Sequence, residues 1–249
     1  MTNFILTGYI AAYALYALTL LTCLVRWDRL SWILSVAALA VNGGVLAGIF
    51  IVVGQPPVFE IYGGLLFTAF VLGILGLLWS PDDEKRLSVA AWVWIGVLLL
   101  FCVTLFFPKE PPPYQHHHSY LWVIFFHGFR CLALSFALFS AAHFIRFRTE
   151  PVRKRAGNSL FRQGRNFLLL SALAFLCGEY AGILWCQHGW GDFWHWNGAF
   201  FQSTLIILCF MFAFHIPGKN PRADDIRSIT AILAPFMMLT VKIVKGLMA

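Results

Sequence analysis

The sequence predicts an all-α membrane protein: a polytopic bundle of about eight transmembrane helices with both termini on the non-cytoplasmic side. Of the 249 residues, 60% are hydrophobic and only 12% are charged, whereas soluble domains carry about a quarter charged residues. Apolar runs of about 20 residues, long enough to cross roughly 30 Å of hydrocarbon as helix, recur along the chain. This composition excludes soluble metabolic enzymes, nucleic-acid-binding proteins and disordered chains.

Eight apolar runs define the expected spans. They cover residues 4–25, 32–53, 61–79, 89–107, 120–144, 167–185, 199–216 and 229–245. The first run has no basic residue before it and is long enough to span, so it is predicted to be a helix rather than a cleaved signal. No repeat or second domain is evident, so residues 1–249 are expected to form a single integral membrane domain.

The positive charges give the orientation. Fourteen of the 18 Lys and Arg residues follow the first, third, fifth and seventh spans, and such loops are retained in the cytoplasm. The expected location is a bacterial-type inner (plasma) membrane, with the intervening loops facing the periplasm or outside. The cationic loop at 146–165 is either a retention signal touching lipid headgroups or a surface for an anionic partner. Six scattered cysteines without a CxxC pair are interpreted as packing residues.

The outer segment GILWCQHGWGDFWHWN, residues 182–197, is the most distinctive part of the sequence. It contains four tryptophans, namely Trp185, Trp190, Trp194 and Trp196. Two interpretations remain open. The indoles form an interfacial aromatic belt, or they form a flat shelf for a large planar apolar ligand.

This segment resembles the tryptophan-rich signature of the cytochrome c assembly proteins, the heme-handling membrane proteins of the CcsA, CcmC and HemX-like group. The stretches GQPPVFEIYGGLLF (residues 54–67) and FFHGFRCLALSFALF (residues 125–139) are similar to two further family stretches in the same order. Asn197 stands where the family has an acid, and Asn42 where it has a histidine in the second span. The chain therefore resembles a divergent member.

The resemblance implies a heme b protein of cytochrome c maturation, acting in heme handling, delivery or redox protection at the outer loop. It implies one heme, or two, with His127 and His215 as candidate iron ligands. The cofactor-binding surface would comprise Trp185, Trp190, Trp194, Trp196 and Asn197. Implied partners are an apocytochrome or c-type cytochrome, a membrane subunit of an assembly or respiratory complex, and lipid. An accessory subunit is favoured over a complete synthase, and HemX-like members would imply a part in tetrapyrrole synthesis.

Arg130 is a functional candidate in its own right, because an arginine inside a membrane span is costly unless it is paired or faces a polar cavity. It follows His127 by about one helical turn. Arg130 and Glu179 lie at equal depth from the outer ends of their spans, so Glu179 is the predicted partner. The pair is either a structural lock between two helices or a site that holds a propionate or moves a proton.

The other histidines leave the ligand set open. His143 lies sixteen residues, about 24 Å, below His127 on one helix. His143 with His215 would ligate an inner heme, while His127 with His188 or His195 would ligate an outer one. The alternative is that His143 snorkels to the interface beside Arg146 and Arg148.

Two functions from other classes fit the same residues. One is a membrane heme b electron-transfer subunit that links quinol to an external cytochrome through two stacked hemes. The other is a heme-free structural anchor of a larger membrane complex. Enzymatic activity of the isolated chain is left open.

Overall fold

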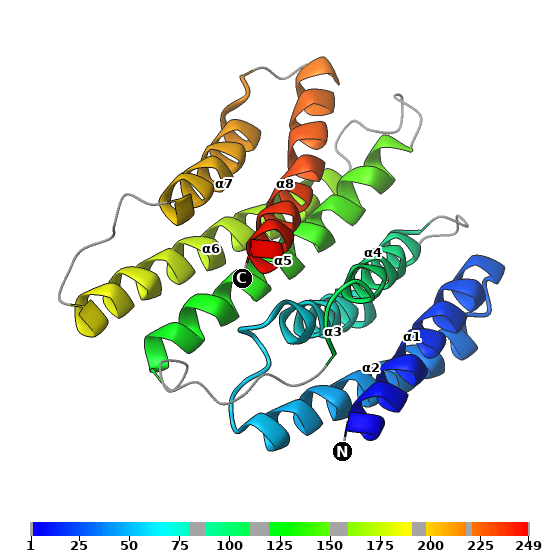
Figure 1. The fold of residues 1–249 in the computed structure, drawn as a ribbon. Coiled ribbons are helices and arrows are strands. Elements are labelled where there is room, and N and C mark those ends of the chain that lie inside the picture. The colour runs from blue at the N-terminus through cyan, green and yellow to red at the C-terminus, as the bar shows by residue number, and fades with distance from the viewer. Residues whose placement is uncertain are drawn as a thin grey trace. The chain divides into compact units, whose positions relative to one another are not determined.

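The protein is all-helical over the residues that its computed structural model describes, which are 2–79, 88–109, 120–149, 159–190, 198–217 and 221–248. These ranges contain eight α-helices, α1 to α8 (Figure 1). Six of them are long and apolar enough to cross a membrane, and α4 and α7 are shorter apolar helices. The predicted all-α class is confirmed for the described residues, and six of the helices have the length and apolar composition that crossing a membrane requires.

The helices group into two compact units, Met1–Ser119 and Tyr120–Ala249. Each unit contains four helices and has its own buried residues. The single integral membrane domain expected from the sequence stays a prediction.

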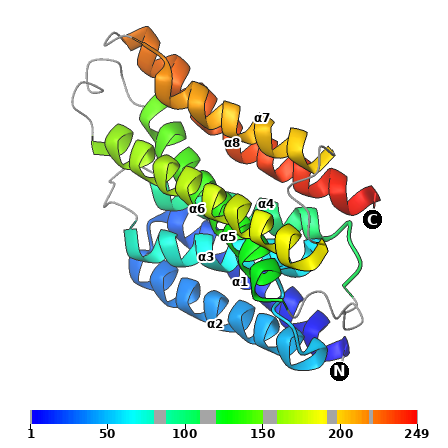
Figure 2. The same cartoon turned by 90° about the vertical axis from the view of Figure 1, so that its left-hand side faces the viewer.

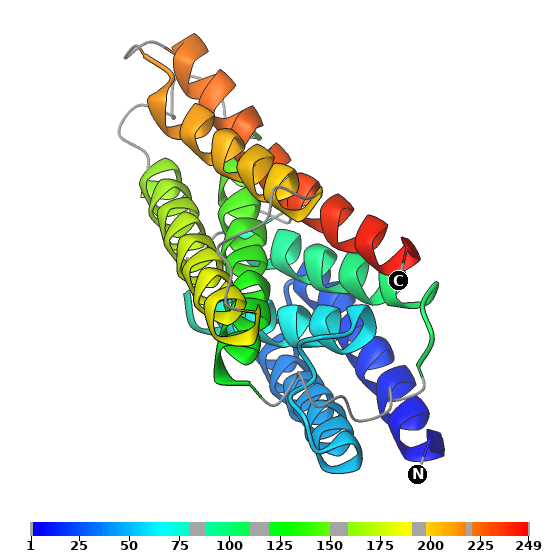
Figure 3. The same ribbon diagram turned by 60° about the vertical axis from the view of Figure 1, so that its left-hand side comes forward.

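The first unit is a ring of four helices. They are α1 (Thr2–Val25), α2 (Asp28–Val53), α3 (Ile61–Trp79) and α4 (Val89–Thr104). Each packs on the next along the chain, and α4 packs back on α1; α1 and α2, in shades of blue, run side by side in Figure 3. The tight connection after α1 places Arg26 at φ 65°. Gly54, in the left-handed conformation at φ 72°, ends α2 by donating its N–H to the carbonyl of Phe50.

Aromatic side chains with hydroxyl groups fill the core of the first unit. Tyr9 stacks on Phe101 with ring centroids 5.3 Å apart, and Tyr16 meets the same ring edge-on at 5.3 Å. The Tyr9 hydroxyl donates to the Phe101 carbonyl at 2.9 Å and lies 3.0 Å from the hydroxyl of Thr104. These neutral hydrogen bonds let the tyrosines be buried without charge.

Asn42, where the resemblance would place a histidine, lies inside this core. It is fully buried, and its amide nitrogen donates to the Tyr16 hydroxyl at 3.3 Å and to the Leu66 carbonyl at 3.4 Å. Asn42 therefore serves as a packing and hydrogen-bonding residue that joins α1, α2 and α3.

The second unit is also a ring of four helices. They are α5 (Leu121–Arg148), α6 (Ser159–Trp190), α7 (Gly198–His215) and α8 (Pro221–Met248). The most extensive packing is between α5 and α6, α8 packs on both α5 and α7, and α6 meets α7 over a small area. Figure 2 shows the axes of α7 and α8 nearly aligned.

Small residues at seven-residue spacing hold α5 and α6 close together. Gly178 faces Phe126 and Arg130, the Ser171 hydroxyl donates to the Ala133 carbonyl at 2.7 Å, and the Ser140 hydroxyl donates to the Gly164 carbonyl at 2.7 Å. A heptad of small residues allows two antiparallel helices to approach closely over many turns. This seam aligns the polar residues of the two helices.

Three helices of this unit extend beyond their predicted spans into polar sequence. α5 continues to Arg148, α6 starts at Ser159, and α8 starts at Pro221. Arg148 reaches across to Asp225, with 3.3 Å between guanidinium nitrogen and carboxylate oxygen, and to the Ser228 hydroxyl at 3.3 Å. These polar ends therefore tie α5 to the start of α8.

Candidate functional site

A buried ion pair joins α5, α6 and α7. Arg130 donates through Nε to Glu179 Oε1 at 3.0 Å, and through Nη2 to the same oxygen and to the Ser203 hydroxyl, the latter at 2.7 Å. The side chains of Arg130 and Glu179 are 17% and 11% exposed. The predicted partnership of these two residues is confirmed, and Ser203 is a third member that the sequence analysis missed.

The surroundings of the guanidinium are aromatic. Its central carbon lies 4.2 Å from the ring centroid of Phe126 and 5.4 Å from that of Phe175. A cation over an aromatic face is attracted by the ring quadrupole, more strongly when water is excluded. The close approach at Gly178, where an added Cβ would lie 3.3 Å from the Phe126 carbonyl oxygen, brings the two helices near enough for this arrangement.

The contacts to Glu179 and Ser203 do not use all the N–H groups of Arg130. A guanidinium has five N–H groups, and the bonds to Glu179 and Ser203 come from Nε and Nη2. Within the described part of the chain, Nη1 has no hydrogen-bond partner. The cluster can therefore stabilise the helix pair and still offer a donor edge to a carboxylate.

Phe126 connects this ion pair to the predicted ligand-binding residues. Its ring lies 5.0 Å from the His127 ring and 6.0 Å from the Trp185 indole, in addition to the contact with Arg130. The structure thus brings His127, Arg130 and Trp185 around one buried phenylalanine. Nothing in the sequence distinguished Phe126, because it is one of 25 phenylalanines.

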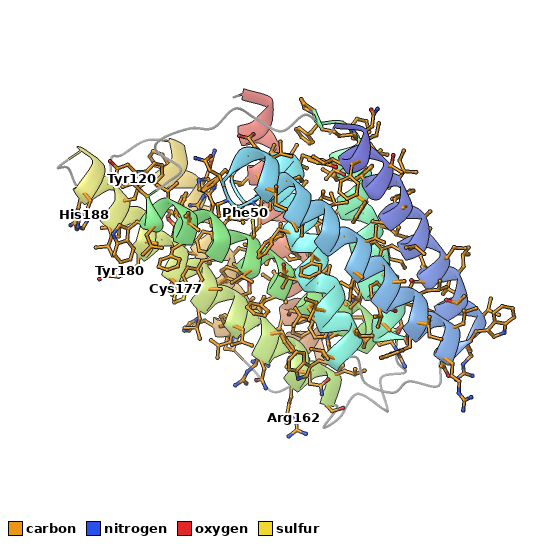
Figure 4. The ribbon with its side chains drawn as sticks, turned by 90° about the horizontal axis from the view of Figure 1, so that it is seen from below. Phe50, Tyr120, Arg162, Cys177, Tyr180 and His188 are labelled. Atoms are coloured by element: carbon orange, nitrogen blue, oxygen red, sulfur yellow. The ribbon has the colours of Figure 1, made fainter. Side chains whose placement is uncertain are left out.

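His188 lies at the same end of the α5–α6 pair. Its ring is 6.4 Å from the indole of Trp122, and its Nδ1 lies 2.8 Å from the Leu184 carbonyl oxygen. When Nδ1 donates to that carbonyl, Nε2 carries the lone pair, which is the tautomer that ligates a metal. Figure 4 shows His188 near the end of α6, close to Tyr120 at the start of α5.

An apolar groove of about 460 Å³ runs along α5 and α6 from Trp122. Phe125 and Phe129 of α5 and Leu173, Cys177 and Tyr180 of α6 also line it. Figure 4 shows Cys177 and Tyr180 following one another along α6 towards His188. An aromatic-walled groove next to an imidazole is the kind of surface that a large planar apolar ligand requires.

His143 occupies a different environment. It is fully buried, its ring meets Phe139 edge-on at 4.7 Å, and it stacks on Phe167 at 6.0 Å. Its Nδ1 lies 2.9 Å from the Phe139 carbonyl oxygen. The snorkelling interpretation is therefore wrong, because the side chain packs inside the bundle instead of reaching its surface.

His215 does not share a site with His127. It is the exposed last residue of α7, twelve residues and about 18 Å along that helix from Ser203, which contacts Arg130. Its Nδ1 lies 2.9 Å from the Met211 carbonyl oxygen. The two candidate iron ligands thus belong to opposite ends of the second unit.

Part of the tryptophan-rich segment lies outside the described residues. This applies to Trp194, His195, Trp196 and Asn197, and to the side chain of Trp190, whose backbone ends α6. The choice between an aromatic belt and a shelf stays a prediction. Among the described side chains, no three from His, Cys, Asp and Glu gather as a multidentate metal site.

Comparison with known proteins yields no assignment: no family model matches the chain, and no curated protein matches it significantly.

Proposed function

We propose that the chain is an inner-membrane protein with eight spans and both termini outside, which binds heme b and takes part in cytochrome c maturation. The apolar helices and the alternation of cationic loops support this topology. The resemblance of the tryptophan-rich segment supports the heme and the pathway. The proposed location is a bacterial-type inner membrane, with the tryptophan-rich segment on its outer side.

One observation carries the proposal: His127, Arg130 and Trp185 surround Phe126 at the end of the α5–α6 pair where the tryptophan-rich segment begins. Heme needs an imidazole for its iron, an aromatic apolar surface for its ring, and donors for its propionates. The residues at this end have that chemistry.

The residues divide into three roles. His127 would supply an imidazole to the heme iron, and His188 or His195 would supply a second one. The tryptophans and the groove beside Trp122 offer the apolar surface. The Nη1 edge of Arg130, which has no partner among the described residues, offers donors to a carboxylate, while Glu179 and Ser203 hold the guanidinium in place. When bound, the heme supplies a redox-active iron, and the protein's part is to position it and limit its access to water.

We propose a single heme in preference to two. A quinol-oxidising subunit needs a second ligand layer on α5, which would have to use His143. That ring is enclosed by Phe139 and Phe167 and has no exposed surface. Its surroundings favour the heme handler over the electron-transfer subunit.

The visible spectrum of the purified chain, with heme stoichiometry, tests the proposal. We expect about one heme per chain and a shifted or lost Soret band in His127→Ala, because an axial bond is removed. The matched control is His143→Phe, which changes a histidine on the same helix and should leave the spectrum unchanged. Separate His188→Ala and His195→Ala variants identify the second ligand.

Other outcomes would point elsewhere. A chain that binds no heme when supplied with hemin in membranes would be an anchor, and two tightly held hemes reducible by quinol would indicate an electron carrier. Replacing Trp190 and Trp194 together should weaken heme retention while the amount of inserted protein stays the same. Equal loss of protein and heme would favour the aromatic belt.

A further inference from the structure

A second cavity, of about 520 Å³, lies where α5 and α7 end and α6 and α8 begin. All four helices of the second unit line it. Its apolar walls include Phe144, Phe161, Leu168, Phe214 and Ala231. Its volume is within the range of about 300–1,000 Å³ that is usual for small-molecule sites.

Two arginines, one on α6 and one on α8, also line this cavity. Arg165 precedes Leu168 and Leu169 on α6 by about one turn, and Arg227 precedes Ala231 on α8 by about one turn. Both helices run in the same sense here, from their first turns into the apolar part of the unit. Leu168, Leu169 and Ala231 line the cavity one turn deeper than the arginines, and Phe161 and Phe214 line it nearer the helix ends. The cavity thus combines two guanidinium groups with apolar walls, which suits an amphiphile with an anionic headgroup.

The two guanidinium groups differ in the number of hydrogen-bond partners that hold them. Arg227 is held by the Ile216 carbonyl oxygen, at 3.1 Å from Nε and 2.7 Å from Nη2, and by Asp224 at 2.9 Å. Arg165 is exposed and makes no hydrogen bond or ion pair with any described residue. Asp224 offsets the charge of Arg227, so among the described residues Arg165 supplies the positive charge that has no carboxylate partner.

We propose that this cavity binds an anionic membrane phospholipid, with the phosphate at Arg165 and the start of an acyl chain against Leu168, Leu169 and Ala231. Arginine is well suited to phosphate recognition, and basic pockets between helices on the cytoplasmic side take anionic headgroups. In the proposed topology the cavity opens to that leaflet. The site is independent of heme, so its failure and that of the heme proposal are distinguishable.

Native mass spectrometry of the full chain with added lipids tests this site. We expect phosphatidylglycerol to be retained in preference to phosphatidylcholine, and Arg165→Gln to lower the phosphatidylglycerol affinity about fivefold. Arg165→Lys should recover most of the affinity because the charge returns. Ala213→Leu, which narrows the cavity without changing charge, should also reduce retention, with thermal unfolding recorded to verify folding.

The matched control is Arg162→Gln. Arg162 is an exposed arginine on the same helix that does not line the cavity, and Figure 4 shows it pointing away from the bundle. Equal losses in Arg162→Gln and Arg165→Gln would overturn the proposal in favour of general surface charge. Equal retention of phosphatidylcholine would also overturn it, as would displacement of the lipid by millimolar inorganic phosphate, which would indicate a free-phosphate site.

Discussion

The two units have the same arrangement of helices but differ in the polar groups that they contain. Both are rings of four helices, and both bury polar groups among apolar ones. In the first, the buried polar groups are neutral hydroxyls and the amides of Asn42 and Gln55, and its described residues form no ion pair. In the second, Arg130 is paired with Glu179 inside the unit, and the partly exposed Arg148 and Arg227 are also each paired with a carboxylate. Five of the eight histidines belong to the sequence of the second unit, and His116, His117 and His118 come at the end of that of the first.

The first unit is therefore held together by packing and neutral hydrogen bonds, whereas the second also contains ion pairs. Neutral hydrogen bonds are individually weak, so the first unit depends on the fit of its side chains. Buried charges are costly when unpaired, so the second unit depends on a few specific partners. Substitutions in each unit should show which dependence holds.

The largest effect is expected when the buried ion pair is broken. Glu179→Leu leaves the Arg130 guanidinium without its carboxylate and should lower the free energy of unfolding by about 3–5 kcal/mol. Detergent-based equilibrium unfolding measures this loss. The double variant Arg130→Met with Glu179→Leu should recover most of it, because no unpaired charge then remains at this position. A loss below about 1 kcal/mol in the single variant would show that the pair does not hold this unit together.

A smaller effect is expected from overpacking the first unit. In Gly76→Ala the new Cβ would lie 2.6 Å from Val93 Cγ1, so α3 and α4 must move apart, at about 1–3 kcal/mol. Gly44 is exposed on α2 and has nothing within 4 Å of an added Cβ. Gly44→Ala should therefore be neutral or stabilising by up to about 1 kcal/mol. Equal stabilities for the two variants would contradict a fit-dependent first unit.

The smallest effect is expected from removing one neutral hydrogen bond. Tyr9→Phe deletes the hydroxyl that contacts Phe101 and Thr104, and should reduce stability by about 1 kcal/mol. Tyr13→Phe is the control, since its hydroxyl makes only a 3.6 Å contact with Cys102 Sγ, and it should change stability by less than about 0.5 kcal/mol. If Tyr9→Phe lowered the free energy of unfolding as much as Glu179→Leu, the two units would not differ in the way described.

Hydropathy located all eight helices but made several of them too short, by four residues at the start of α2 and at the end of α5 and by more in α6 and α8. The predicted span at 61–79 coincides with α3, whereas α6 begins eight residues before its span, at Ser159, and α8 begins eight before its span, at Pro221. An apolar run indicates how much of a helix can lie in hydrocarbon. The helix itself can continue past that run into polar sequence, because its backbone hydrogen bonds do not depend on apolar side chains. The missed turns hold Arg165 and Arg227, so the second cavity was also missed.

The ion pair was predictable because depth along a transmembrane helix is a one-dimensional measure, and equal depth on neighbouring helices permits contact. Ser203 and Phe126 were not predictable in the same way. A serine in an apolar helix usually forms its hydrogen bond with the backbone of the same helix. A phenylalanine in an apolar sequence does not stand out from its neighbours. Their roles depend on which helix faces which, and that follows only from tertiary packing.

The close seam between α5 and α6 has a consequence for biosynthesis. Arg130 is translated 49 residues before Glu179, so α5 on its own would present an unneutralised cation to the acyl chains. The translocon should therefore retain α5 until α6 emerges and release the two as a helical hairpin, with the charge already matched.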